Sequence, residues 1–337
     1  MSSDHDTCHC GHEHADGAKH IYIYSPSSAV RDKAAFRRGV KRLQKLGHQV
    51  EIDTDALASH TRFAGDDATR LAAIHRAAAS GADVALISRG GYGLTRILPG
   101  IDYAAVARAI DGGMRFVGVS DFTAFQNAVL AQTGAVTWAG PSLGADFGVK
   151  GLPDDIMEAC FDDLLCGHGE GTGWRTLHEK PVAATTAVSA VDASAVATPL
   201  AFEIPSARLW GGNLAVLASL VGTPYLPQVP GGILFIEDVN EHPYRVERLL
   251  TQLLYAGVLA QQKAVIFGQF TGYQLATHDK GFKLQTVVEW LRRQIVAPVL
   301  TNLPYGHVET KVCLPVGAQV ELSVQGRDAL LYWGHAH

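Results

Sequence analysis

The chain has 337 residues, 47% of them hydrophobic, and a formal net charge of -5. Such a composition predicts a soluble globular protein with one large domain or two ordinary ones. Acidic and basic residues are nearly balanced, which leaves no broad basic face for nucleic acid and no polybasic patch for a membrane surface. The longest apolar run, residues 214–222, is far shorter than the roughly 20 residues that span a bilayer. We therefore expect no nucleic acid partner and no membrane partner.

Residues 1–17 form a polar stretch rich in histidine and cysteine. It lacks the positive and apolar regions of a secretory signal peptide, so we expect a cytoplasmic protein. The cysteines of the chain are few and irregularly spaced, which favours reduced thiols over a disulfide framework. Cys8, His9, Cys10, His12 and His14 could bind zinc, nickel or copper. The alternative, which we favour, is a disordered tail whose ligands are too crowded for a closed metal site.

Residues 18–150 alternate between strand and helix patterns. Aromatic and β-branched residues predict a strand at 20–24, and apolar residues three and four apart predict a helix over 31–47. The next predicted elements are a strand at 48–53, a helix at 66–80, a strand at 82–88, a glycine loop at 89–93, a strand at 114–120 and a helix at 122–134. This alternation predicts an N-terminal α/β domain with a parallel sheet and flanking helices.

The second half of the chain has a looser pattern. Residues 151–200 include an Ala/Val/Thr/Ser-rich stretch from about 181, and we interpret them as an interdomain region. Further elements are a turn into a helix within 209–227, a strand at 231–239, a helix at 244–261, a strand at 264–270, a helix at 286–295 and short β segments within 312–324. These predict a C-terminal domain of mixed α and β structure over residues 201–337.

Two stretches of the N-terminal domain end predicted strands, where α/β sheets gather ligands. Ser120 follows the strand at 114–120 and precedes a helix, so it is either a helix N-cap, the commoner case, or a nucleophile at a strand-to-helix turn. The glycines of RGGYG at 89–93 could bring backbone N–H groups to an anion or form a plain tight turn.

In the second half, the strand at 231–239 ends in Glu237 and Asp238, with Glu241 shortly after. Such carboxylates can orient a histidine or cap a helix. His307 lies in a predicted loop, where a histidine is usually a solvated surface group. A serine nucleophile needs a base whose tautomer a carboxylate holds, and Ser120, His307 and Glu237 supply these three parts. Spacing alone does not bring them together.

Several motifs, in this order, resemble the LD-carboxypeptidase family, the muramoyl-tetrapeptide carboxypeptidases of peptidoglycan recycling, whose relatives include microcin C immunity peptidases. The motifs are YSPSS at 24–28, FAGDDATR at 63–70, RGGYGLTRILPGIDY at 89–103, FVGVSDFTA at 116–124, GGNLAVLASLVGTPYLP at 211–227, GGILFIEDVNEHPYRVERLL at 231–250 and LPYGHVETKVCLPVGAQVEL at 303–322. The resemblance covers nearly the whole chain after about residue 18.

The resemblance implies a two-domain serine peptidase with a Ser-His-Glu triad, which here would be Ser120, His307 and Glu237. The substrate would be a cytoplasmic, recycled murein tetrapeptide, cut between meso-diaminopimelate and D-alanine. The resemblance also implies a homodimer and no metal or organic cofactor.

The same resemblance gives roles to the residues around the serine. Backbone N–H groups of Asp121 and Gly91 would form the oxyanion hole. Gly90 and Tyr92 would lie against the substrate.

Three alternatives remain open. The first is a microcin-type immunity peptidase, for which Trp174, Trp210 or Tyr92 would provide an aromatic platform for a nucleobase. The second is a non-catalytic protein that binds an anion or peptide at the glycine loop and the helix after Ser120. The third is metal storage or delivery through residues 1–17.

Overall fold

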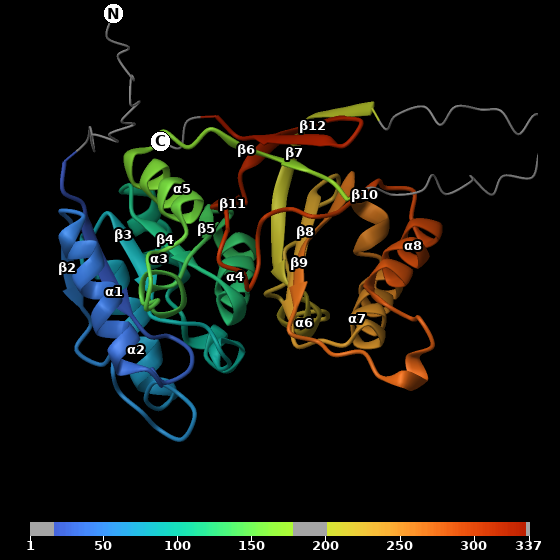
Figure 1. The fold of residues 1–337 in the computed structure, drawn as a ribbon. Helices are drawn as coiled ribbons and strands as arrows, with labels where there is room; N and C mark the ends of the chain where they lie inside the picture. The colour runs from blue at the N-terminus through green and yellow to red at the C-terminus, as the bar shows by residue number, and fades with distance from the viewer. Residues whose placement is uncertain (1–16, 178–200, 335–337) are drawn as a thin grey trace, which may run out of the picture.

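The computed structural model describes residues 17–177 and 201–334, which form two sheets with helices packed around them (Figure 1). The predicted metal ligands between residues 8 and 14, and the Ala/Val/Thr/Ser-rich stretch at 181–200, lie outside the described residues.

The first sheet is built almost entirely from the N-terminal half, in the order β11-β5-β4-β3-β1-β2. Its strands are β1 (His20–Tyr24), β2 (Gln49–Ile52), β3 (Val84–Ile87), β4 (Arg115–Gly118), β5 (Thr137–Ala139) and β11 (Leu314–Val316). The first five are parallel, as the alternation of strand and helix predicts, and β11 joins the edge antiparallel to β5. The C-terminal half therefore completes this sheet.

Helices cover both faces of the first sheet. They are α1 (Lys33–Lys45), α2 (Asp67–Ala79), α3 (Tyr103–Asp111), α4 (Thr123–Thr133) and α5 (Asp155–Cys166). Successive side chains of a strand point to opposite faces. Ile21 and Ile23 accordingly share a buried cluster with α1 and α5, whereas Tyr22 and Tyr24 pack with α2, α3 and α4.

The second sheet has the order β10-β9-β8-β7-β12-β13-β6. Its strands are β6 (Gly171–Arg175), β7 (Ala201–Asn213), β8 (Ile233–Val239), β9 (Ala264–Thr271), β10 (Val299–Leu300), β12 (Gln319–Gln325) and β13 (Asp328–Tyr332), and its helices are α6 (Leu214–Ser219), α7 (Pro243–Tyr255) and α8 (Leu284–Gln294). Strands β10, β9, β8 and β7 are parallel, and β12, β13 and β6 continue the sheet antiparallel. The predicted class, a parallel-sheet unit followed by a mixed α/β unit, is confirmed.

Two local predictions differ from the structure. The turn expected at the start of 209–227 is the end of the long strand β7, in which Gly211 and Gly212 adopt φ angles of 132° and 127°. A Cβ atom at Gly211 would overlap the carbonyl oxygen of Phe235 on the neighbouring strand, so glycine marks close packing here instead of a turn. The loosely patterned region from residue 151 contains helix α5 and strand β6. The domain limits at 150 and 200 remain predictions.

Helix α4 lies between the two sheets and contacts β7 and α6 (Figure 1). The side-chain amide of Asn127 on α4 donates to the carbonyl of Gly211 at 2.9 Å, and Thr123 Oγ1 accepts from the backbone N–H of Asn213 at 2.9 Å. The start of α4 is therefore bound to the end of β7. In the described ranges, no helix has the length and apolar character needed to cross a membrane.

Candidate active site

Ser120 occupies a strained turn between β4 and α4. Its φ angle is +69°, a left-handed conformation that non-glycine side chains adopt infrequently, and it begins a short 3-10 turn, Ser120–Phe122. No side-chain hydrogen bond caps either this turn or α4. The commoner interpretation of Ser120, a helix N-cap, therefore does not describe its hydroxyl. Strain of this kind is typical of functional positions.

The glycine loop at 89–93 packs directly against Ser120. A Cβ atom at Gly90 would lie 2.6 Å from Ser120 Cβ and 2.9 Å from its Oγ, distances that a side chain cannot occupy. At Gly91, whose φ angle is +117°, a Cβ atom would overlap Ser28 Oγ, and that hydroxyl accepts from the backbone N–H of Tyr92 at 3.1 Å. The loop therefore fits between Ser28 and Ser120 because it carries glycines.

The side chain of Asp121 ties together the segments around the serine. It is buried, and its Oδ2 accepts from Ser27 Oγ at 2.6 Å and from the backbone N–H of Leu94 at 3.0 Å. Burial raises the pKa of this carboxyl, and the hydrogen bonds and nearby arginines only partly offset the rise. Sequence reasoning assigned a role to the Asp121 backbone N–H alone and missed this contribution of its side chain.

Glu237 and His307 form a direct pair. His307 Nδ1 donates to Glu237 Oε2 at 2.8 Å, and the Glu237 side chain is fully buried at the end of β8. A Cβ atom at Gly306 would lie 3.2 Å from Glu237 Oε2, so the glycine before the histidine permits this approach. Because Nδ1 carries the shared proton, the neutral imidazole presents Nε2 as its acceptor.

The pKa of His307 reflects opposing causes. Burial is the largest and lowers it, but the hydrogen bond and the charge of Glu237 raise it by more, so the net pKa lies above the ordinary value. The charge of Lys311 also lowers the pKa, and that of Asp238 raises it. A base with a raised pKa accepts a proton more readily.

Only one of the three neighbouring carboxylates contacts the histidine. Asp238 accepts from the side-chain amide of Asn213 and from the backbone N–H of Ala215, both at 2.9 Å, and thereby binds the start of α6. Burial, with a smaller contribution from the charge of Glu237, raises the pKa of Asp238 to about 6. Glu241 lies 3.9 Å from Arg245 and forms an ion pair with it.

Asn213 links the two halves of the site and was missed from the sequence. Its backbone N–H binds Thr123, three residues after Ser120, and its side-chain amide donates to Glu237 Oε1 at 3.2 Å. A hydrogen-bonded path therefore runs from the helix after Ser120 to His307. The described residues show no hydrogen bond between Ser120 and His307, and such contacts are often long before substrate binds. The signal was an asparagine between a strand and a helix, within the quoted GGNLAVL motif.

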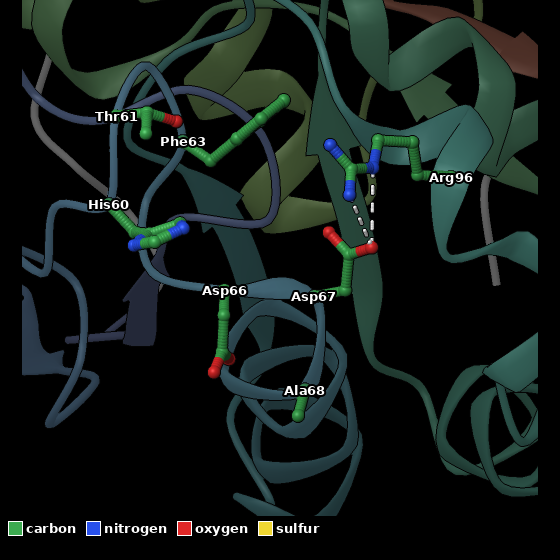
Figure 2. A pocket seen from close by; sticks show the side chains of 7 residues that line it. All are labelled: His60, Thr61, Phe63, Asp66, Asp67, Ala68 and Arg96. Atoms are coloured by element: carbon green, nitrogen blue, oxygen red, sulfur yellow. Dashed lines mark hydrogen bonds and ion pairs between the residues drawn. The ribbon is translucent and has the colours of Figure 1, made fainter.

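A cavity of about 520 Å³ lies beyond Tyr92, at the N-terminus of α2. Its lining residues are His60, Thr61, Phe63, Asp66, Asp67, Ala68 and Arg96, and Figure 2 shows Asp67 and Arg96 joined by hydrogen bonds. The rings of Phe63 and Tyr92 are 5.9 Å apart, which connects the cavity to the glycine loop.

Of the three aromatic residues considered as a platform for a nucleobase, only Tyr92 is exposed. Trp174 and Trp210 are buried in the second sheet, and their indole N–H groups donate to Thr301 O at 3.0 Å and to Gln262 Oε1 at 2.9 Å. Neither presents a face to a ligand, so the prediction was wrong for both. Tyr92 is 44% exposed and remains available.

In the parts of the chain that the structure describes, no three His, Cys, Asp or Glu side chains are grouped as metal ligands.

Comparison with known proteins connects this geometry to a family. The LD-carboxypeptidase N-terminal domain family matches residues 21–140, and the LD-carboxypeptidase C-terminal domain family matches residues 206–322. The chain belongs to the LD-carboxypeptidase family. The first match contains Ser120 and the glycine loop, and the second contains Glu237 and His307.

Relatives that match over most of their length support the same assignment. A muramoyltetrapeptide carboxypeptidase from Oxalobacter formigenes has a crystal structure with a TM-score of 0.80 and 34% identity, covering 94% of this chain and 98% of that one. A protein described as a probable murein peptide carboxypeptidase of Bacillus subtilis is 28% identical over 87% of this chain and 85% of its own length. The microcin C7 self-immunity protein of Escherichia coli is 26% identical over 91% of each chain. This LD-carboxypeptidase family member is therefore a peptidase.

Proposed function

We propose that the protein is a serine LD-carboxypeptidase that releases D-alanine from murein tetrapeptide, with Ser120, His307 and Glu237 as its triad. The observation that carries the proposal is the 2.8 Å pair between His307 and the buried Glu237, joined through Asn213 to the helix that begins beside Ser120. A serine hydroxyl that caps no helix, in a strained turn, and a histidine with an oriented tautomer are the parts that nucleophilic catalysis by serine requires.

In the proposed reaction, Ser120 Oγ attacks the carbonyl carbon of the diaminopimelate residue while His307 Nε2 takes the proton of the hydroxyl. The negative charge that develops on the carbonyl oxygen is bound by the N–H groups of Asp121 and Gly91, and one such donor typically contributes about 3 kcal/mol to barrier lowering. The carbon–nitrogen bond then breaks, and His307 returns the proton to the departing D-alanine. Water, with His307 again as base, hydrolyses the acyl-enzyme.

The choice of a murein peptide rests on similarity to the Oxalobacter formigenes and Bacillus subtilis proteins. Gly90 and Tyr92 would lie against the substrate, because the glycine loop borders both Ser120 and the cavity beyond Tyr92. We further propose a role in peptidoglycan recycling in the cytoplasm as a homodimer, on the strength of the family resemblance alone.

A comparison of three purified substrates tests the proposal. We expect the protein to release D-alanine from the tetrapeptide, to leave the epimer that ends in L-alanine intact, and to hydrolyse aspartyl adenylate more slowly. Cleavage of the adenylate with no release of D-alanine would favour the immunity-peptidase alternative. Binding of the tetrapeptide without cleavage would favour a non-catalytic binding protein.

A further inference from the structure

Three arginines gather beside the glycine loop, on the side of Ser28. Arg89 directly precedes Gly90, and its guanidinium donates to the carbonyl of Ala29 at 3.1 Å. Arg62 is held at the same place, because its backbone carbonyl accepts from the Ala29 N–H at 2.9 Å and its guanidinium lies 5.5 Å from the centre of the Tyr92 ring. Arg31 follows Ala29 by two residues, and its charge acts on Arg89.

None of these arginines forms an ion pair with a carboxylate within residues 17–177 and 201–334, although the charge of Arg62 acts on Asp121. The neighbouring arginines, Arg70 and Arg96, by contrast both form ion pairs with Asp67. The nearby carboxylate of Asp121 is buried and already bound by Ser27 and Leu94.

Arg89 is the member of the group most shielded from water, because the side chains of Arg31 and Arg62 are exposed. It is half-buried, and of its five N–H donors the described residues occupy one, with the carbonyl of Ala29. Burial lowers the pKa of Arg89, and the charges of Arg31 and Arg62 lower it further. Like charges held together without a counter-charge destabilise one another until an anion binds between them. A guanidinium favours an anion with two oxygens, such as a carboxylate.

We propose that Arg89, supported by Arg31 and Arg62, binds the free carboxylate of the substrate's terminal D-residue. This inference rests on the proposed function. In a carboxypeptidase substrate, only the amide nitrogen and one carbon atom separate that carboxylate from the carbonyl under attack. Arg89 is correspondingly close to Ser120, because Gly90, the residue after Arg89, packs against that serine. The arginines would thus make the enzyme cut at a chain end.

The test compares the tetrapeptide with its C-terminal carboxamide, which lacks the negative charge. We expect the native protein to favour the free acid, and Arg89→Ala to lose about 10- to 150-fold in kcat/KM on the acid with little change on the amide. Arg89→Lys keeps the charge but not the paired donors, so its kcat/KM on the acid should lie between that of the native protein and that of Arg89→Ala. Arg37→Ala, on the exposed surface of α1, is the matched control and should retain the native preference. Circular dichroism and thermal melting check that each variant folds.

A binding measurement separates this inference from the proposed function. Calorimetry on Ser120→Ala, with and without Arg89→Ala, should show tighter binding of the acid than of the amide only where Arg89 is present. Equal binding of acid and amide by Ser120→Ala, or an unchanged preference in Arg89→Ala, would overturn the inference. Failure of the native protein to release D-alanine, with the acid preference in binding intact, would overturn the proposed function and leave the carboxylate site standing.

Discussion

Replacement of Glu237 by glutamine removes a charge from the proposed site while nearly preserving shape. In the native protein, the carboxylate accepts the Nδ1 proton of His307 at 2.8 Å from a fully buried position. When His307 takes the serine proton, an imidazolium forms at that distance. Two unit charges so placed attract by about 6 kcal/mol at an effective dielectric constant of about 20.

Part of that attraction will survive in Glu237→Gln, because the amide oxygen can still accept the Nδ1 proton. We therefore expect kcat/KM to fall by about 1,000- to 10,000-fold, equivalent to roughly 4–5.5 kcal/mol. The pKa of His307 should also fall, since the two largest causes that raise it both come from Glu237, and burial then dominates. The acidic limb of the pH profile should shift to lower pH as the rate drops.

The pH dependence of the free energy of unfolding provides a second test of the pair. The folded pKa of His307 is raised above its unfolded value of about 6.5. The pair therefore stabilises the fold fully below about pH 6.5, and this contribution is lost as the pH rises through the folded pKa. In denaturant titrations, Glu237→Gln should have a lower free energy of unfolding than the native protein, and this difference should shrink as the pH rises from about 6.5 through the folded pKa of His307.

The matched control is Glu241→Gln, which removes a carboxylate from the same segment that does not contact His307. Its kcat/KM and pH profile should stay near the native values. A Glu237→Gln enzyme within about tenfold of native kcat/KM, with an unshifted acidic limb, would refute the assignment of Glu237 as the residue that orients the base.

Three further perturbations test other parts of the site. Because His307 must be neutral to act as a base and its pKa is raised, kcat/KM of the native enzyme should rise with pH through an apparent pKa above 6.5, and a limb at or below 6.5 would contradict this. Gly90→Ala places a methyl group 2.6 Å from Ser120 Cβ and should lower kcat by at least about 100-fold with the fold retained, as measured by D-alanine release and circular dichroism. Lys311→Met leaves the buried carboxylate of Asp146 without its 2.6 Å partner and should lower the free energy of unfolding by about 3–5 kcal/mol in denaturant titrations.

Two variants provide matched controls for these changes. Gly151→Ala adds a methyl group where no atom lies within 4 Å, so activity should be unchanged. Arg175→Met breaks the exposed ion pair with Asp328 and should change stability by less than about 1 kcal/mol. An equal loss of activity in both glycine variants, or an equal loss of stability in both ion-pair variants, would contradict the structural explanation of the effect.

The sequence predicted β1 to β4 of the first sheet, with α1, α2 and α4, because these elements carry clear periodic patterns, and Ser120 was placed at a strand end for that reason. It missed the short strand β5 and helix α3, and it assigned the segment of β11 to the C-terminal domain. It failed at Gly211 and Gly212, where glycine permits close packing against Phe235 within a strand. Local rules interpret such glycines as turns, since the neighbouring strand is distant in sequence.

The site was partly predictable for the same physical reason. A carboxylate at a strand end was visible, and the family resemblance selected Glu237, but residue patterns alone did not separate it from Asp238 and Glu241, whose partners lie elsewhere in space. Asn213 binds groups that are distant along the chain, Thr123 and Glu237, so its place between a strand and a helix did not reveal its partners. The arginine group at Arg89 depends equally on contacts between separate loops.

The most direct test of the account is release of D-alanine from murein tetrapeptide by the native chain and by Ser120→Ala, both in the presence of a metal chelator. The account predicts release by the native protein and none above background from the variant, with both proteins folded. Comparable release by Ser120→Ala, or loss of native activity on chelation, would contradict a metal-independent serine mechanism at Ser120.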